Sequence, residues 1–426
     1  MHGAFAIPPA KIAALMVLGI SLYRTSSAVT ALIRGPYLQR PGDTAIAILW
    51  KTSSSNLGSV AYRPIPRAGQ PRRDSGPSSR AQTAVTSLEP WKIAGETLAQ
   101  DSHRIALHDL APGVLYEYQV LADGEALSPT FRFRSPRCPA DPTLAFGVIG
   151  DTTGGTVPAA IADKLSGAGV DLVLHVGDVV YPDGRLEDYD SNFFGPFAPL
   201  LSVAPMMPIL GDHDIRTADG APFFEVFDLP PNGLTPDPRF YSFRQGDAEF
   251  FCLDVESSEF GEDSDQYRWL DHGLQTSTAV WKFVTLFEPP FTSENSNVVE
   301  RLVLSPLFER YGVDLVFSGH EHLYERTKPI RLFGPPGTPV VYIVEGGGGA
   351  SVSNFDQESF SAFLAAVYGY VTVRIEERSL LLEAHDVSGA VIDSMTLFKP
   401  IGSNATGETC SAAAPPGDVR RPCAPL

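Results

Sequence analysis

Four short polar clusters along the chain carry the residue types that hydrolytic metal sites use. They are residues 150–153 (GDTT), 177–181 (GDVVY), 211–214 (GDHD) and 319–326 (GHEHLYER). Each cluster alone is weak evidence, because an aspartate after a buried strand is often only a helix cap. All four in one chain, each directly after an apolar run, indicate a metal site rather than unrelated polar turns.

The carboxylate, phenol and imidazole groups of these clusters suit the hydrolysis of a phosphate ester. That reaction needs a hydroxide at near-neutral or acidic pH, and cations that offset the charge on the phosphoryl oxygens. Two metal ions about 3.5–4 Å apart supply both. A carboxylate can bridge such a pair, while imidazole nitrogens and further oxygen atoms hold each ion. The four clusters therefore predict a two-metal hydrolytic site.

The elements that must position these clusters belong to an α/β pattern that begins near residue 138. Strands are expected at 144–150, 172–177, 208–210, 249–253, 282–287, 315–318 and 340–344, and helices at 158–166 and 266–274. This alternation predicts a layered α/β domain with buried strands. Nearly every apolar run ends in residues rich in Asp, His or Gly, and ligand sites in such sheets collect at the carboxyl ends of the strands. The clusters are therefore expected to meet at one edge.

The region before residue 138 has a different character, that of an all-β domain. Short alternating runs predict strands at 44–50, 103–107, 116–120 and 130–134. Residues 110–116 (LAPGVLY) resemble the turn that carries a tyrosine corner in fibronectin-like sandwiches. Residues 63–80 are rich in Pro, Gly, Ser and Arg and are expected to form an exposed loop.

The two ends of the chain are typical of processing and tail segments. An apolar run at 12–23 follows Lys11 and precedes small residues before Ala28 and Ala31. It is short for a membrane span, which needs about 20 apolar residues. We therefore expect residues 1–31 to be a signal peptide, and the mature chain to be secreted or periplasmic without stable membrane association; the alternative is an uncleaved anchor. Residues 401–426 are expected to be a disordered tail.

Charge and cysteine content exclude some classes of partner. The formal net charge of -18 argues against a nucleic-acid partner, because the phosphate backbone would be repelled. It does not exclude a small phosphorylated substrate, since bound cations can reverse the field within one pocket. The chain has four cysteines and no CxxC pattern, which argues against a cysteine-ligated metal. Composition does not indicate an oligomeric state.

The order of the motifs resembles the DxG, GDxxY, GNH, HxPP and GHxH signature of the purple acid phosphatases, within the calcineurin-like metallophosphoesterases. Further similar segments are 35–39 (GPYLQ), 241–243 (YSF), 266–270 (QYRWL) and 311–315 (YGVDL), so that the resemblance covers roughly residues 33–400. It implies a fibronectin-like β-sandwich over residues 32–137. It also implies a metallophosphoesterase catalytic domain over residues 138–400, with layered α/β/β/α architecture and mixed sheets.

The resemblance also implies a role for each site residue. The first metal would be held by Asp151, Asp178, Tyr181 and His322, and the second by Asp178, Asp212 and His320, with Asp178 bridging. A tyrosinate at Tyr181 implies iron in the first site, while zinc, manganese or iron would fill the second if it is occupied. Asp178 and His213 would be the catalytic residues, with His213 stabilising or protonating the leaving group. The implied activity is that of an acid phosphatase-like hydrolase of phosphate monoesters, without a covalent phosphoenzyme.

Three departures from the family pattern bear on this site. Thr153 stands where the DxG motif has glycine, and Asp212 replaces the asparagine of GNH, which adds negative charge. The segment 281–292 (WKFVTLFEPPFT) aligns to the family's WKIVxxHxPPYS, so that Phe287 takes the place of a histidine ligand. The neighbouring Glu288 could serve instead if the strand slipped by one residue, which would exchange its two faces.

The glycine-rich segment Gly346 to Gly349 is a separate feature. It predicts a tight loop after a strand rather than a phosphate cradle.

Three functions stay open on this evidence. The first is an active phosphomonoesterase with an altered second metal site. The second is a degenerate, non-catalytic member that binds one metal or an anion, which the phenylalanine at position 287 favours. The third is a phosphodiesterase, which would differ from the first only in the shape of its pocket.

Overall fold

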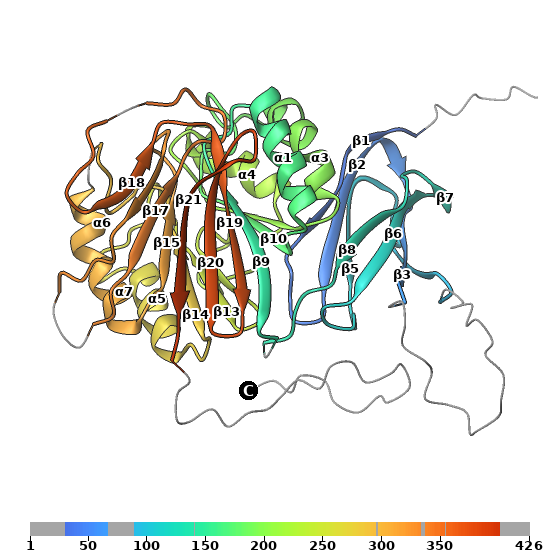
Figure 1. Cartoon of the computed structure of the whole chain (residues 1–426). Helices are drawn as coiled ribbons and strands as arrows, with labels where there is room; N and C mark the ends of the chain where they lie inside the picture. The colour runs from blue at the N-terminus through green and yellow to red at the C-terminus, as the bar shows by residue number, and fades with distance from the viewer. Residues whose placement is uncertain are drawn as a thin grey trace, which may run out of the picture.

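The computed structural model describes residues 30–66, 89–139, 141–294, 297–333, 337–353 and 355–400. Figure 1 shows an all-β region, drawn in blue and cyan, beside a larger α/β region. The predicted signal peptide lies almost wholly outside the described residues, as do most of the predicted basic loop and the whole C-terminal tail. Within the described ranges, no helix has both the length and the apolar character that a membrane crossing requires.

The N-terminal region consists of two antiparallel sheets that face each other. One has the order β1 (Leu32–Gln39), β2 (Ile46–Asn56), β5 (Gln100–Leu107), and the other β4 (Lys92–Gly95), β3 (Gly58–Pro64), β6 (Leu115–Ala122), β7 (Glu125–Ala126), with β8 (Phe131–Arg134) also pairing with β6. Inward residues such as Ile48, Trp50 and Tyr118 form one core. Tyr116 accepts a hydrogen bond from the backbone N–H of Ala111 at 3.0 Å, which closes the predicted tyrosine corner.

The α/β region is built on two mixed sheets. The first has the order β11 (Met206–Pro208), β10 (Leu172–His175), β9 (Thr143–Ile149), β19 (Gly369–Glu376), β20 (Ser379–Asp386), β21 (Val391–Phe398). The second has the order β12 (Tyr241–Gln245), β13 (Ala248–Cys252), β14 (Trp281–Thr285), β15 (Leu315–Ser318), β17 (Val341–Glu345), β16 (Tyr324–Thr327), β18 (Ser361–Ala365). The predicted fold class, an all-β region followed by an α/β domain with mixed sheets, is confirmed.

Helices cover the outer faces of the paired sheets. They are α1 (Thr156–Ala168), α2 (Leu186–Tyr189), α3 (Gly195–Leu201), α4 (Ala221–Val226), α5 (Asp265–Thr276), α6 (Val298–Val303) and α7 (Ser305–Tyr311). Phe146 of the first sheet packs edge-on against Phe250 and Phe317 of the second. Phe251, one residue further along β13, instead joins the core beneath α5 and α7, because successive side chains of a strand point to opposite faces.

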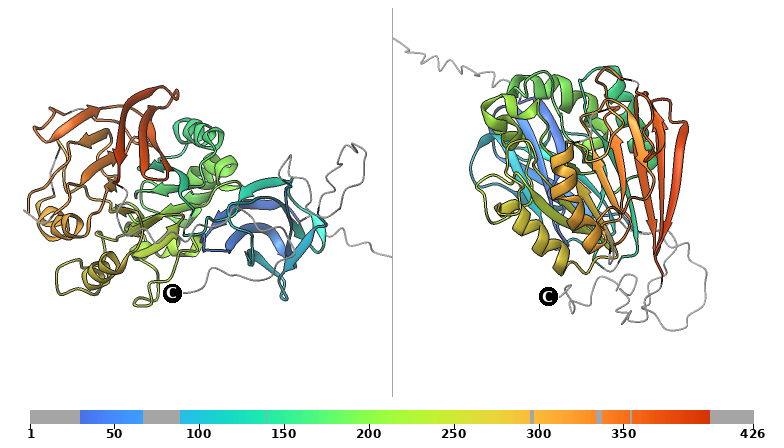
Figure 2. Two further views of the ribbon diagram at one scale, coloured as in Figure 1. Left: turned by 60° about the horizontal axis from the view of Figure 1, so that its bottom comes forward. Right: turned by 90° about the vertical axis from the view of Figure 1, so that its left-hand side faces the viewer.

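The N-terminal β region packs on the first half of the α/β region. Figure 2 shows it at the end of the molecule opposite the orange elements. Tyr37 donates its hydroxyl hydrogen to the carbonyl of Val226 at 2.8 Å, and the hydroxyl of Tyr118 donates to the carbonyl of Ser202 at 2.9 Å. Both hydroxyls are buried, so that these bonds fix the β region against α3 and α4.

Candidate metal centre

The predicted ligands lie in loops that leave the carboxyl ends of parallel strands. Asp151 follows β9, Asp178 follows β10, Asp212 follows β11, and His320 and His322 follow β15. β9, β10 and β11 are parallel neighbours in the first sheet, as are β14 and β15 in the second. The backbone N–H of His320 donates to Asp151 Oδ2 at 3.1 Å, which joins the loops of the two sheets at one edge.

Three of these residues have left-handed backbone conformations, which residues other than glycine seldom adopt. The φ angles are 58° at Asp151, 52° at Asp178 and 69° at His320. Such conformations cost about 1–3 kcal/mol each and concentrate at functional sites, where the surrounding structure enforces them. Their coincidence at three predicted ligands supports a functional site at this edge.

Asp151, Tyr181 and His322 form the first group of contacts. The Tyr181 hydroxyl donates to Asp151 Oδ1 at 3.2 Å and lies 3.1 Å from His322 Nε2, which is itself 3.5 Å from Asp151 Oδ1. His322 Nδ1 donates to the carbonyl of Ser351 at 3.0 Å, so that Nε2 of the neutral ring is left with a free lone pair for a metal. A carboxylate, a phenol and an imidazole thus meet within contact distance.

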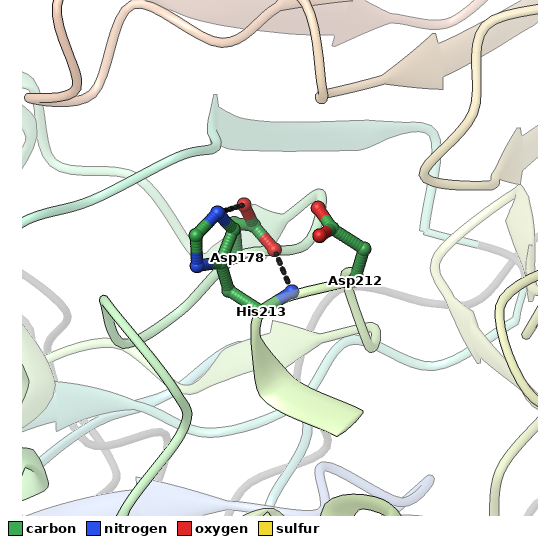
Figure 3. A group of neighbouring side chains, drawn as sticks. All are labelled: Asp178, Asp212 and His213. Carbon is green, nitrogen blue, oxygen red and sulfur yellow. Dashed lines mark hydrogen bonds and ion pairs between the residues drawn. The ribbon is translucent and has the colours of Figure 1, made fainter. Parts of the chain in front are cut away.

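Asp178, Asp212 and His213 form the second group (Figure 3). One potential ligand atom from each residue lies within 4.8 Å of those of the other two. Among the described residues, this is the one group of three or more His, Cys, Asp or Glu side chains that meets this limit. Asp178 Oδ1 accepts the backbone N–H of His213 at 2.9 Å, and Oδ2 lies 3.9 Å from His213 Nε2. The His213 ring lies against Tyr181, with 4.1 Å between the ring centroids.

The electrostatics of both groups favour a bound cation. Burial, followed by the charges of Asp151 and Asp214, raises the pKa of Asp178 to about 10. Burial also raises the pKa of Asp151, against the lowering effects of His322, His320 and Tyr181. Each shift reports a carboxylate charge that the protein groups alone do not compensate, and a bound divalent cation would supply the compensation. The residues of the first site therefore fit a metal ion.

His320 lies between carboxylates from two different loops. Its Nδ1 is 4.0 Å from Asp212 Oδ1, and its Nε2 is 3.6 Å from Glu288 Oε1. Arg216 pairs with the other carboxylate oxygen of Asp212. The guanidinium therefore offsets part of the negative charge that aspartate adds at this position.

Phe287 follows β14 and lies beside Gly177 and the His320 ring. β14 pairs with β15 through Phe283↔Leu315 and Thr285↔Phe317, and the strand ends at Thr285, before Phe287. The Phe287 side chain is fully buried. A Cβ atom added to Gly177 would lie 2.2 Å from Phe287 Cδ2, and the Phe287 ring meets the His320 ring edge-on at 5.1 Å. A buried apolar ring thus stands at the sequence position where the family's pattern has a histidine.

Glu256 adds a carboxylate to the surroundings of Glu288 and Asp212. Burial, followed by the charges of Glu288 and Asp212, raises the pKa of Glu256 to about 8. Its Oε1 is shielded from solvent and has no hydrogen-bond partner among the described residues. Sequence analysis missed this residue, because it follows a strand in a segment outside the recognised motifs.

Asp214 is a second residue that sequence analysis missed, although it stands inside the GDHD cluster. Its fully buried carboxylate accepts backbone N–H groups from Val179 at 3.1 Å, Val180 at 3.2 Å and Gly211 at 3.0 Å. Burial raises its pKa to about 7, although these N–H groups act in the opposite direction. Asp214 therefore ties the loop that carries Asp178 to its own loop.

The Asp214→Asn variant should lower the free energy of unfolding by about 2 kcal/mol. The new amide nitrogen would face a backbone N–H donor, so that at least one buried N–H loses its acceptor. Urea unfolding measures the change, and Asp265→Asn is the control, because the Asp265 side chain is 73% exposed in an ion pair with Arg268. Equal stabilities for the two variants would contradict a structural role for Asp214.

The loop at Thr152 and Thr153 is held by hydrogen bonds rather than by a glycine turn. The Thr152 hydroxyl donates to the carbonyl of Val179 at 2.9 Å and accepts from His175 Nε2 at 3.0 Å. Burial lowers the pKa of His175 to about 3, which keeps its ring neutral. Thr153 donates to the carbonyl of Gly349 at 3.0 Å, which explains how a β-branched residue is accommodated.

The glycine-rich segment after β17 is a structural loop, as predicted. The Gly348 N–H donates to the carbonyl of Gly150 at 3.0 Å, and the Ala350 N–H donates to the carbonyl of Asp151 at 3.0 Å. A Cβ atom added to Gly348 would lie 2.1 Å from the Gly150 carbonyl oxygen. The glycine permits close approach to the Asp151 loop.

Comparisons with known proteins agree with this architecture. The family model for calcineurin-like phosphoesterases matches residues 144–324, and one described as iron/zinc purple acid phosphatase-like protein C matches residues 340–394. The chain is 26% identical over 423 residues to probable inactive purple acid phosphatase 27 of Arabidopsis thaliana, covering 83% of this chain and 67% of the relative. It is 28% identical to purple acid phosphatase 1 of Ipomoea batatas, covering 65% of this chain and 66% of the relative.

A solved structure shows the same fold. Purple acid phosphatase PPD1 from yellow lupin (Lupinus luteus) seeds superposes with a TM-score of 0.68 at 20% sequence identity. The superposition covers 86% of this chain and 74% of that one. The shared architecture therefore includes both the all-β region and the α/β region.

Proposed function

This chain belongs to the purple acid phosphatase-like calcineurin-like phosphoesterases, and on that premise we propose that it is an exported, metal-dependent phosphatase acting on phosphate monoesters. The observation that carries the proposal is the meeting of Asp151, Tyr181 and His322, with the bridging candidate Asp178 on the adjoining loop. The family of iron- and zinc-containing relatives suggests a two-metal centre. We assign iron to the first site, because it contains Tyr181, and zinc, manganese or iron to the second.

In hydrolysis, some residues of this chain would bind the metal ions and another would transfer a proton. Bound cations would acidify a water nucleophile and offset the charge of the phosphoryl oxygens. Asp178 would lie between them, with its orientation fixed by the N–H of His213. The roles of the other residues follow from where their donor atoms point.

His213 is placed to protonate the leaving oxygen. Its Nδ1 donates to the carbonyl of Pro182, which can only accept, so that Nδ1 carries a hydrogen. The Nε2 atom faces Asp178 and can carry a second proton only when the ring is positively charged. His213 would therefore protonate the leaving oxygen through Nε2.

The proposed substrate is a small phosphorylated molecule. The net charge of -18 disfavours nucleic acid, and partial exposure of His213 and His320 leaves the site open to a soluble ester. We propose that no stable membrane association remains after the signal is removed. A non-catalytic binding role is the second candidate, favoured by buried Phe287 and by similarity to a relative named as probably inactive.

Metal removal tests the proposal directly. Dialysis of the mature chain against a chelator should abolish hydrolysis of p-nitrophenyl phosphate, and iron with zinc or manganese should restore it. Circular dichroism before and after dialysis controls for unfolding, and bis(p-nitrophenyl) phosphate in parallel distinguishes a phosphodiesterase. Turnover that is unchanged by the chelator would contradict the proposal. No turnover, with one ion or none bound per chain, would support the non-catalytic role instead.

A further inference from the structure

We propose that Arg216 binds a second anionic group of the substrate, so that the site prefers phosphate monoesters whose leaving group carries a carboxylate or a further phosphate. This inference rests on the proposed function and names the class of substrate. It gives the guanidinium a part in recognition, in addition to the charge that it offsets at Asp212. Arg216 would set the choice between esters rather than perform the hydrolytic step.

The first support is the position of Arg216 beside the proposed proton donor. Arg216 Nη1 donates to the carbonyl oxygen of Pro182 at 3.1 Å, and His213 Nδ1 donates to the same oxygen. The two side chains therefore lie next to each other, in one short segment after β11. Because His213 would protonate the leaving oxygen, a group attached to that oxygen would come close to Arg216.

The second support is that Arg216 has hydrogen-bond donors to spare. A guanidinium group has five N–H donors. In the part of the chain that the structure describes, Arg216 uses two of them, one to Pro182 and one to Asp212 Oδ2. Its side chain is 42% exposed, so that the other N–H groups can meet a ligand from solvent. Arginine binds carboxylate and phosphate oxygens well, because its planar donors match their geometry.

The third support is the distribution of charge around the predicted ligands. Within the described ranges, Arg216 is the one lysine or arginine that forms an ion pair with a predicted metal ligand. Its partner Asp212 lies on the Nδ1 side of the His320 ring, at 4.0 Å, whereas Glu288 lies on the Nε2 side, at 3.6 Å. An anionic group would therefore be repelled on the Glu288 side and attracted on the Arg216 side.

Metal binding by Asp212 would strengthen this attraction. The carboxylate pairs with Arg216 through Oδ2, while Oδ1 faces His320. When Asp212 binds a cation, its negative charge is shared with that ion, so that it offsets less of the positive charge of the guanidinium. Recognition of an anionic leaving group would therefore accompany metal loading.

A pair of small esters tests the inference on the full mature chain. 2-Phosphoglycolate and ethyl phosphate have the same carbon skeleton, but only the first carries a carboxylate on its leaving group. The metal-loaded wild type should have the higher kcat/KM for 2-phosphoglycolate. In Arg216→Gln this preference should fall at least about tenfold, as loss of a hydrogen bond between charged groups typically causes. In Arg216→Lys it should fall less, because the charge is kept.

Arg185→Gln is the matched control. Its side chain is 54% exposed, and its ion pair in the described part of the chain is with Asp183, not with a predicted ligand. The preference between the two esters should therefore stay that of the wild type. Metal content should be measured on every preparation. An equal loss of activity toward both esters in Arg216→Gln, together with a loss of metal, would overturn the inference and leave Arg216 only the role of holding Asp212.

Ligand binding separates this inference from the proposed function. In calorimetric titration, the metal-loaded chain should bind 2-phosphoglycolate more tightly than ethyl phosphate, and the difference should disappear in Arg216→Gln. That result without any hydrolysis would support recognition by Arg216 and contradict the proposed function. Hydrolysis of both esters with the same preference in the wild type and in Arg216→Gln would overturn the inference and leave the proposed function standing.

Discussion

Replacing Asp178 by alanine should lower the rate of p-nitrophenyl phosphate hydrolysis by at least about 10³-fold, a loss typical of removing a central group from a catalytic centre. Asp178 is the one residue proposed to contact both ions, and its side chain is only 2% exposed. The variant should also bind fewer metal ions, because both sites lose a ligand. Hydrolysis and metal content should be measured on the same preparation.

Asp183→Ala is the matched control for Asp178→Ala. Asp183 lies on the same loop, but its side chain is 35% exposed and its ion pair is with Arg185, at the surface. Exposed pairs of this kind contribute about 0–1 kcal/mol, so that rate and metal content should stay near those of the wild type. Equal activity of Asp178→Ala and Asp183→Ala, in the presence of each metal, would argue for the non-catalytic role.

Replacing Gly177 by alanine should destabilise the protein by about 3–5 kcal/mol, from overpacking together with backbone strain. The added Cβ would lie 2.2 Å from Phe287 Cδ2, and Gly177 has a φ angle of 102°. Because Asp178 is the next residue, the same change should displace the bridging carboxylate and reduce metal binding. Urea unfolding and elemental analysis measure the two effects.

Two further variants separate the steric cause from the backbone cause. Gly155 has a similar φ angle of 84° but no atom within 4 Å of an added Cβ, so that Gly155→Ala should cost only about 1 kcal/mol. Adding Phe287→Ala to Gly177→Ala should cost about 2 kcal/mol less than the sum of the single changes, because the double variant removes the clash. Strict additivity would show that the Phe287 ring does not set the size limit at position 177.

The edge on which the site forms could be predicted from the sequence, because apolar runs that end in Asp or His clusters place those clusters at the carboxyl ends of parallel strands. The strands β19, β20 and β21 were not predicted. Strand β21 alternates only partly buried with exposed residues, which makes its signal weak. A local pattern also could not reveal Asp214 or Glu256, because their roles depend on loops that meet only in three dimensions.

Glu288 shows why one motif position can mislead. Alignment of the segment predicts that either Phe287 or Glu288 faces the site, because adjacent residues of a strand point to opposite faces. The strand ends two residues earlier, at Thr285, so that this rule no longer applies. Phe287 is buried beside His320 while Glu288 also reaches that histidine. Strand ends are among the least certain features of a sequence-based prediction.

The hydrogen bonds that join the site loops bear on the order in which the protein matures. The N–H groups of Asp151 and Thr152 donate to the carbonyls of Gly177 and Asp178. The Asp214 carboxylate accepts the N–H of Val179, in the loop of Asp178, and the N–H of Gly211, in its own loop. These bonds involve protein atoms alone, so that they can form before any ion binds. We therefore expect the chain to fold first and to acquire its metals afterwards, with little further ordering. Which metals it carries would then reflect the ions available where folding ends, and one chain could be loaded differently in different surroundings.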